Sequence, residues 1–119
     1  MRLNPFDYPM TLADPHRITV DPAWVEHIPF AFVLVEMLRP AVIVELGTYR
    51  GNSYCAFCQA VAALNLPTRC FAIDTWHGDP QTGEYPEKVY DELRTHHDPR
   101  YGAFSTLRPA HLRGGEARF

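Results

Sequence analysis

Residues 44–53 read VELGTYRGNS and place a carboxylate and two glycines where an apolar run ends. Glu45 can offer its carboxylate to a cationic amine. Gly47 lets the backbone approach a ligand without a Cβ in the way, and Gly51 permits a tight entry into a helix. These residue types predict a small-molecule site at a strand-to-helix turn.

A second carboxylate, Asp74, ends the next apolar run, RCFAIDTW at 69–76. In open α/β sheets ligands lie beyond the carboxyl ends of the strands, where a carboxylate can accept both hydroxyls of a ribose. The pattern E-x-G-x-x-x-G at 45–51 differs from the dinucleotide fingerprint G-x-G-x-x-G, because a pyrophosphate disfavours a nearby carboxylate. A ligand with an amino-acid end and a sulfonium carries cationic groups, which a nearby carboxylate stabilises. The pattern therefore favours S-adenosylmethionine over NAD, and a Rossmann-type NAD binder remains a weaker alternative.

The elements that must position these residues alternate between helix and strand. Asp21 and Pro22 are a helix start signal, Pro29 predicts a kink or a division of the helix, and Pro40 stops it. Short β-branched apolar runs predict buried parallel strands, and the Ala-rich segment between them predicts a crossover helix. The predicted order is a helix over 22–39, a strand over 41–46, a helix over 52–66 and a strand over 69–76.

The rest of the chain is predicted to add a loop, a helix and a strand. The loop covers 77–85, the helix starts at Pro86 and ends before Asp98, and 103–107 form a third strand. Past Leu107 the hydrophobic period is lost. The predicted organisation is thus an irregular arm over 1–21, an α/β cofactor-binding domain over 22–107 and a disordered tail over 108–119.

Composition narrows the class of protein. The 119 residues allow one domain, and 46% hydrophobic residues indicate a globular chain. A net charge of −3 with dispersed arginines argues against nucleic acid as a partner. The longest apolar stretch, at 28–38, is too short for a bilayer span, and residues 1–10 lack the apolar core of a signal peptide. We therefore expect a cytoplasmic protein that does not enter membranes.

The two motifs together resemble those of a known enzyme class. VELGTYRGNSY followed by CFAIDTWHGD is similar to the first two motifs of class I S-adenosylmethionine-dependent methyltransferases. It looks closest to the bacterial branch often found beside glycan-building or natural-product genes, whose leading helix resembles WVEHIPFAFVLVEMLRP at 24–40. The resemblance covers 22–107 and implies a Rossmann-like parallel sheet with flanking helices, of which this chain holds the N-terminal portion.

The resemblance also implies roles for individual residues. Glu45, Gly47 and Gly51 would line the methionine end of S-adenosylmethionine. Asp74 would hold the ribose, and Thr75 or Trp76 would border the adenine. The remaining predicted cofactor-binding residues, from the same loop, are Thr48, Tyr49, Asn52 and Ser53. No residue is assigned as catalytic, and no metal site is predicted.

Other groups of potential chemical interest have simpler interpretations. Cys55 and Cys58 form C-x-x-C, but on an Ala-rich helix they are expected to be small buried hydrophobes. His77 and Asp79 follow the second strand, near where a substrate would lie, and could serve as a base, although a solvated loop is the preferred interpretation. The pair His96–His97 is expected to complement a helix C-terminus.

A full class I methyltransferase would have a seven-stranded sheet, and this chain ends before the later strands. The loss of pattern after Leu107 predicts a truncated or frame-shifted copy, and the exposed sheet edge predicts self-association. Two functions stay open. One is a methyltransferase, or its cofactor-binding half, acting on an oxygen or nitrogen of a small molecule or glycan. The other is an inactive α/β fragment that acts as a binding module.

Overall fold

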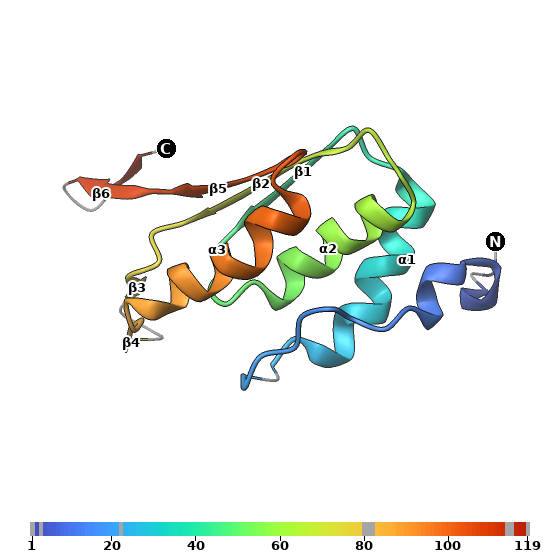
Figure 1. The fold of residues 1–119 in the computed structure, drawn as a ribbon, viewed down its shortest axis with the longest axis horizontal. Helices are drawn as coiled ribbons and strands as arrows, with labels where there is room; N and C mark the ends of the chain where they lie inside the picture. The colour runs from blue at the N-terminus through green and yellow to red at the C-terminus, as the bar shows by residue number, and fades with distance from the viewer. Residues whose placement is uncertain (1, 3, 22, 80–82, 114–115, 119) are drawn as a thin grey trace.

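The computed structural model of the chain describes residues 2, 4–21, 23–79, 83–113 and 116–118. An arm of short 3-10 helices leads into alternating helices and strands (Figure 1). The elements are η1 (Pro5–Asp7), η2 (Pro9–Leu12), η3 (Val25–His27), α1 (Ile28–Leu38), β1 (Val42–Leu46), α2 (Asn52–Ala63), β2 (Arg69–Asp74), β3 (Gly78–Asp79), β4 (Gly83–Glu84), α3 (Lys88–Tyr101), β5 (Ser105–Pro109), β6 (His111–Arg113) and β7 (Glu116–Arg118).

A parallel sheet in the order β1-β2-β5 organises the fold. Leu46 of β1 lies opposite Ile73 of β2, and Ile73 lies opposite Arg108 of β5. The carboxyl ends of the three strands therefore meet at one edge of the sheet. The predictions of an α/β fold, of a parallel sheet with flanking helices and of a crossover helix between the first two strands are confirmed.

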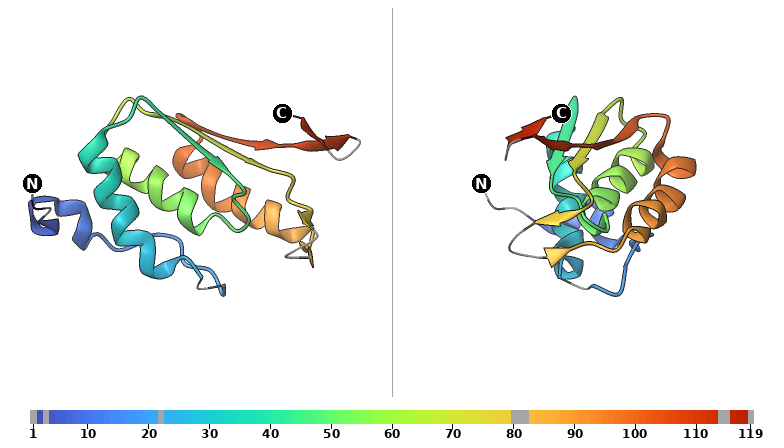
Figure 2. Two further views of the ribbon diagram at one scale, coloured as in Figure 1. Left: turned by 180° about the vertical axis from the view of Figure 1, so that it is seen from behind. Right: turned by 90° about the vertical axis from the view of Figure 1, so that its left-hand side faces the viewer.

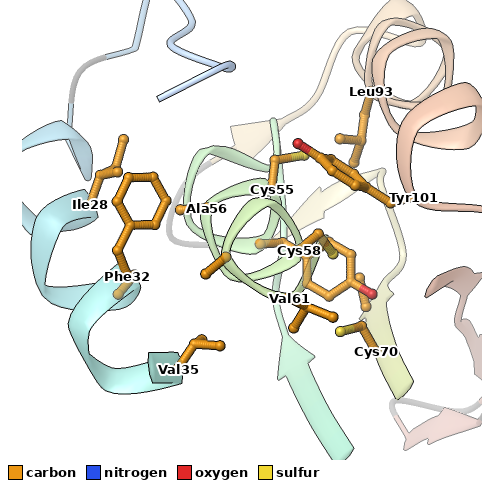
Figure 3. Packing of buried hydrophobic residues seen from close by; sticks show 14 of the residues in the cluster. Ile28, Phe32, Val35, Cys55, Ala56, Cys58, Val61, Cys70, Leu93 and Tyr101 are labelled. Atoms are coloured by element: carbon orange, nitrogen blue, oxygen red, sulfur yellow. The ribbon is translucent and has the colours of Figure 1, made fainter. Parts of the chain in front are cut away.

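The three α-helices pack on one face of this sheet (Figures 1 and 2). Their apolar side chains form the core with inward-facing strand residues (Figure 3). Its fully buried members include Phe32 of α1, Tyr54 and Cys58 of α2, Cys70 of β2 and Leu93 of α3. On the opposite face, Val42, Val44 and Leu46 of β1 are exposed. The sheet is thus covered on one side only by the described residues.

The first helix starts later than predicted. Residues 25–27 form the separate turn η3, and α1 begins at Ile28 with Pro29 in its first turn. Proline fits there because the first turn has no N–H partner to lose, and its fixed φ suits a helix start. Pro29 therefore marks the beginning of α1: the predicted segment is divided next to Pro29, between η3 and α1, and is not kinked there.

The end of α3 also differs from the prediction. The helix continues through Pro99 to Tyr101, although the sequence predicted an end before Asp98. Its last turns carry His97 and Tyr101, both buried, and Gly102 N–H donates to the Asp98 carbonyl at 3.0 Å. Tertiary packing thus holds the final turn in spite of Pro99.

The third strand is confirmed but runs over 105–109, and the chain beyond it differs from the predicted disordered tail. Ala110 N–H donates to the Asp74 carbonyl at 2.8 Å, and Ala110 is buried. The strands β6 and β7 then pair antiparallel. Backbone pairing of β6 with β7 has no hydrophobic period in the sequence to predict it, and a disordered tail over 108–119 stays a prediction for this segment as a whole.

Candidate functional site

A cavity of about 340 Å³ lies at the loop that connects β1 to α2. The loop between the two elements supplies most of its wall, and the N-terminal arm supplies the rest. The lining residues are Asp21, Ala23, Trp24, Glu45, Leu46, Gly47, Thr48, Tyr49, Arg50, Gly51, Asn52 and Ser53. Seven of the ten predicted cofactor-binding residues are in this set; Asp74, Thr75 and Trp76 are not.

Glu45 is the charged centre of this cavity. Ser53 Oγ donates to Glu45 Oε2 at 2.7 Å, whereas Glu45 Oε1 is buried with no hydrogen-bond partner among the described residues. Burial raises the pKa of the Glu45 carboxyl above its usual value, the Ser53 hydrogen bond and the nearby Thr48 hydroxyl oppose that rise, and the charge of Asp74 adds to it. The site therefore holds a carboxylate that a cationic or N–H-bearing ligand would stabilise.

Thr48 is a second unsatisfied group beside Glu45. It is buried, and within the described part of the chain its hydroxyl has no partner of good hydrogen-bond geometry. Buried hydroxyls almost always find a partner in native proteins. The Thr48 side chain lies close enough to Glu45 to lower the pKa of that carboxyl, and since neither Thr48 Oγ1 nor Glu45 Oε1 has a hydrogen bond of good geometry among the described residues, both can serve a polar ligand.

The two glycines serve different purposes. Both adopt a left-handed φ of +81°, which favours glycine. A Cβ at Gly47 would meet nothing within 4 Å and would stand in open space, whereas a Cβ at Gly51 would collide with the Leu93 side chain. Gly47 therefore leaves room for a ligand, and Gly51 lets the start of α2 pack closely on α3.

Asp74 lies at the tip of β2 next to the cavity. Its Oδ2 accepts from Tyr49 N–H at 2.8 Å and its Oδ1 accepts from Trp76 N–H at 2.9 Å. The strand tips are adjacent, since Gly47 N–H donates to the Ile73 carbonyl at 2.8 Å. The carboxylate thus fixes the loop after β1, and each oxygen keeps a lone pair for another donor.

Trp76 and Asn52 have structural contacts that the sequence did not reveal. Trp76 is buried, its Nε1 donates to the Tyr49 carbonyl at 2.9 Å, and its ring lies 4.6 Å from that of Tyr90. Asn52 Nδ2 donates to Thr19 Oγ1 at 2.9 Å. Trp76 therefore stabilises the β1–α2 loop through its bond to Tyr49, and Asn52 holds the N-terminal arm through its bond to Thr19.

Sequence reasoning missed the arm's part in the site. Asp21, Ala23 and Trp24 line the cavity, although the sequence indicated only a helix start for Asp21. Ala23 N–H does donate to Asp21 Oδ1, at 3.3 Å. No spacing in the sequence links these residues to 45–53, because only the tertiary fold brings the arm over the loop.

The remaining candidates take no part in this cavity. Cys55, Cys58 and Cys70 are free and buried, as expected for the first two. Across the described residues no three His, Cys, Asp or Glu side chains come together in a way that could hold a metal ion. His77 is exposed, and the side chain of Asp79 is outside the described part. His97, predicted to complement a helix end, is instead buried between Asp98 and Ser105.

Comparison with known proteins places the chain in a family. A family model described as "Methyltransferase domain" matches residues 44–118, more than half of the chain. The chain belongs to this methyltransferase family. The matched segment starts at β1 and includes Glu45, both glycines and Asp74.

Two individual proteins are similar to this methyltransferase-family chain. "Uncharacterized protein y4gI" of Sinorhizobium fredii (strain NBRC 101917 / NGR234) is 50% identical over 96 residues, which are 81% of this chain and 10% of that protein. The chain thus spans a tenth of the relative's length. A solved structure titled "cmcI-N160 SAH" is 23% identical with a TM-score of 0.47, covering 87% of this chain and 45% of that one. Along the described chain, no helix has the length and apolar character needed to span a membrane.

Proposed function

We propose that the chain binds S-adenosylmethionine at the β1–α2 cavity and forms the cofactor-binding part of a methyltransferase. The methyl acceptor would be an oxygen or nitrogen of a small molecule or glycan. The observation that carries the proposal is the buried, unpartnered Glu45 Oε1 beside the open space at Gly47, within a segment that matches a methyltransferase family.

The residues present fit such a cofactor. Glu45 would face its amino-acid end, because a buried carboxylate whose pKa is raised gains most from a cationic partner. Gly47 would let the backbone approach the ligand, and Thr48 would direct its free hydroxyl to it. Asp74 would use its remaining lone pairs on the ribose hydroxyls while it holds the loop.

When bound, the cofactor would supply a methyl group on a sulfonium, which a nucleophile can attack in line. The contribution of this chain's residues to that reaction is positioning and electrostatics. Glu45 and Asp74 fix the orientation of the ligand at the strand tips, and the arm at Trp24 helps to close the cavity. A cytoplasmic location and the absence of nucleic-acid partners stay predictions.

Calorimetric titration with S-adenosylhomocysteine tests the proposal. The wild-type chain should release binding heat, and Glu45→Gln should weaken binding about tenfold, which corresponds to about 1.4 kcal/mol. Glu87→Gln is the matched control, because Glu87 is exposed and does not line the cavity. A folded wild type without binding heat would refute the proposal and favour a non-catalytic α/β module.

A further inference from the structure

Residues 13–20 of the N-terminal arm lie outside the helices and strands, and apolar burial does little to hold them. The residues of this stretch alternate between partly buried and exposed. Its two large aliphatic side chains, Ile18 and Val20, are 55% and 90% exposed. Since they bury little apolar surface, they contribute little to holding the arm on the rest of the fold. The attachment of this stretch must therefore come from polar contacts.

Gln59 of α2 binds the arm through both ends of its side-chain amide. Its Oε1 accepts from His16 N–H at 2.8 Å, and its Nε2 donates to the Asp14 carbonyl at 2.7 Å. Gln59 is 6% exposed, so water has little access to replace these bonds. Leaving a buried amide without its partners costs more than the net gain of an ordinary hydrogen bond. The two bonds therefore fix the arm on α2 at residues 14–16.

Asn52 holds the arm in the same way at the start of α2. Its Oδ1 accepts from Thr19 N–H at 3.1 Å, and its Nδ2 donates to Thr19 Oγ1 at 2.9 Å and to the Asp21 carbonyl at 3.0 Å. Asn52 precedes Gln59 by about two helical turns, so both side chains lie on the same face of α2. The two amides therefore set the path of the arm along this helix.

The arm held in this way supplies one wall of the cofactor cavity. Asp21, Ala23 and Trp24 line the cavity beside the β1–α2 loop. The arm also bonds to that loop directly, because Arg17 Nε donates to the Arg50 carbonyl at 2.8 Å and Arg50 lines the same cavity. A ligand that contacts both the loop and the arm binds better when the arm is in place, so its binding favours the attached state of the arm.

We propose that Gln59 is a positioning residue of the cofactor site, which holds the arm so that Asp21 and Trp24 close one side of the cavity. Gln59 is not among the described residues that line the cavity, so it acts through the arm. The inference rests on the proposed S-adenosylmethionine site. It extends that proposal, because the affinity for the cofactor then depends on two hydrogen bonds outside the site.

Limited digestion with trypsin reports whether the arm is attached. Cleavage after Arg17 requires this half-buried side chain to leave the Arg50 carbonyl. Mass spectrometry follows the fragment that begins at Ile18, and cleavage after Arg69 in the central strand β2 serves as the measure of whole-chain unfolding. We expect saturating S-adenosylhomocysteine to slow cleavage after Arg17, relative to Arg69, by about tenfold, because proteolysis follows the population of the open form.

The same digestion separates a failure of this inference from a failure of the proposed function. Wild type that binds the ligand in calorimetry, but is cleaved after Arg17 equally fast with and without it, would overturn the inference and leave the proposed function intact. Wild type that releases no binding heat would refute both.

Gln59→Leu removes both bonds to the arm at a similar side-chain volume. Without ligand, cleavage after Arg17 should become about tenfold faster, because two hydrogen bonds that hold the arm are lost. Cleavage after Arg69 should stay as in wild type. Calorimetry should show S-adenosylhomocysteine binding weakened by about threefold, because part of the population has lost the arm from the cavity wall. Equal acceleration at both cleavage sites would indicate general destabilisation and overturn the positioning role.

Thr68→Val is the matched control, since it also deletes a buried side-chain hydrogen bond. Thr68 is 1% exposed, and its hydroxyl donates to the Pro40 carbonyl at 2.6 Å at the amino end of β2, opposite the strand ends that face the cofactor cavity. Cleavage after Arg17 and ligand binding should both stay as in wild type. If Thr68→Val loosens the arm as much as Gln59→Leu does, the effect is not specific to Gln59 and the proposal is wrong.

Discussion

At the scale of single residues, the ionised Glu45 side chain is expected to lower the stability of the fold and to strengthen cofactor binding. Its pKa is raised in the folded protein, so the stability it contributes is present at low pH and is lost as pH rises through that raised pKa. Ionising Glu45 therefore costs stability as pH rises. Glu45→Gln should raise the free energy of unfolding at neutral pH, measured by urea denaturation, while it weakens cofactor binding. A destabilised variant would show that the charge is already compensated within the chain.

The same pKa predicts how binding depends on pH. If the ionised Glu45 holds a cationic ligand group, affinity for S-adenosylhomocysteine should fall as pH drops through the raised pKa of this carboxyl. Binding near that pH should release a proton, which calorimetry in two buffers of different ionisation enthalpy detects. Glu45→Gln should flatten the dependence. Parallel pH profiles for the variant and wild type would assign the proton to another group.

Alanine substitutions at Gly47 and Gly51 should distinguish an effect on ligand binding from an effect on stability. Gly47→Ala meets no neighbouring atom, so it costs only the left-handed φ, about 1 kcal/mol, and its methyl group should impair ligand entry. Gly51→Ala has the same φ and also strikes Leu93, so it should cost more than Gly47→Ala in thermal denaturation. Equal stability losses would mean that α3 moves away freely at Leu93.

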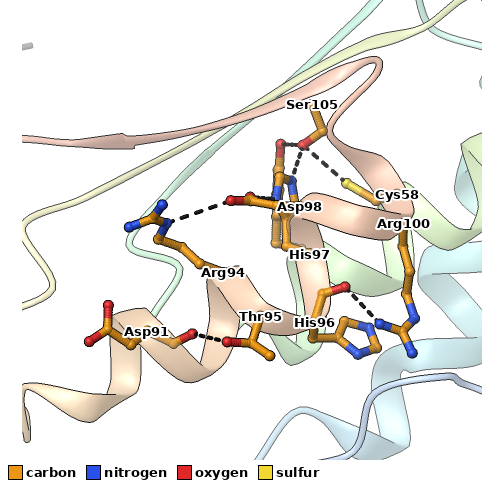
Figure 4. A network of polar contacts seen from close by, with 10 residues as sticks. Cys58, Asp91, Arg94, Thr95, His96, His97, Asp98, Arg100 and Ser105 are labelled. Atoms are coloured by element: carbon orange, nitrogen blue, oxygen red, sulfur yellow. Dashed lines mark hydrogen bonds and ion pairs between the residues drawn. The ribbon is translucent and has the colours of Figure 1, made fainter.

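At the scale of elements, one buried hydroxyl connects α2, α3 and β5 within the core. Ser105 of β5 contacts His97 Nε2 of α3 at 2.7 Å (Figure 4). It also contacts the Tyr54 hydroxyl of α2. Ser105→Ala would leave both partners buried without it, at about 1–3 kcal/mol for each group. Thr106→Ala, the neighbouring exposed position, is the control and should change stability by less than about 0.5 kcal/mol. Similar losses in both variants would refute this role for the network.

The elements also show what sequence can predict. The run 41–46, the glycine turn and the second apolar run are local signals, and they sufficed for the β1-α2-β2 unit and for most of the loop that lines the cavity. The contribution of Trp24 to the cavity and the burial of Trp76 depend on contacts between distant segments. The continuation of α3 past Pro99 has the same origin, because the burial of Tyr101 outweighs a local stop signal. Local rules fail at these points because tertiary packing decides them.

At the scale of the whole molecule, the sheet has one covered and one open face. β1 ends the strand order, and Val44 at its centre is 55% exposed on the face opposite the helices. Exposed apolar patches and unpaired strand edges both favour association. We therefore propose that a second copy of the chain covers this region in solution.

Val44→Lys tests that proposal, because a charge on the exposed face opposes apolar contact and strand pairing without entering the core. Sedimentation velocity over a range of concentrations should show self-association of the wild type and at least tenfold weaker association of the variant, at a similar melting temperature. Leu12→Lys is the control, since Leu12 is 75% exposed on the N-terminal arm, away from β1 in the fold, and should associate as wild type does. If both variants associate equally, the open face is not the contact; if wild type stays monomeric at all concentrations, the chain tolerates its exposed sheet alone.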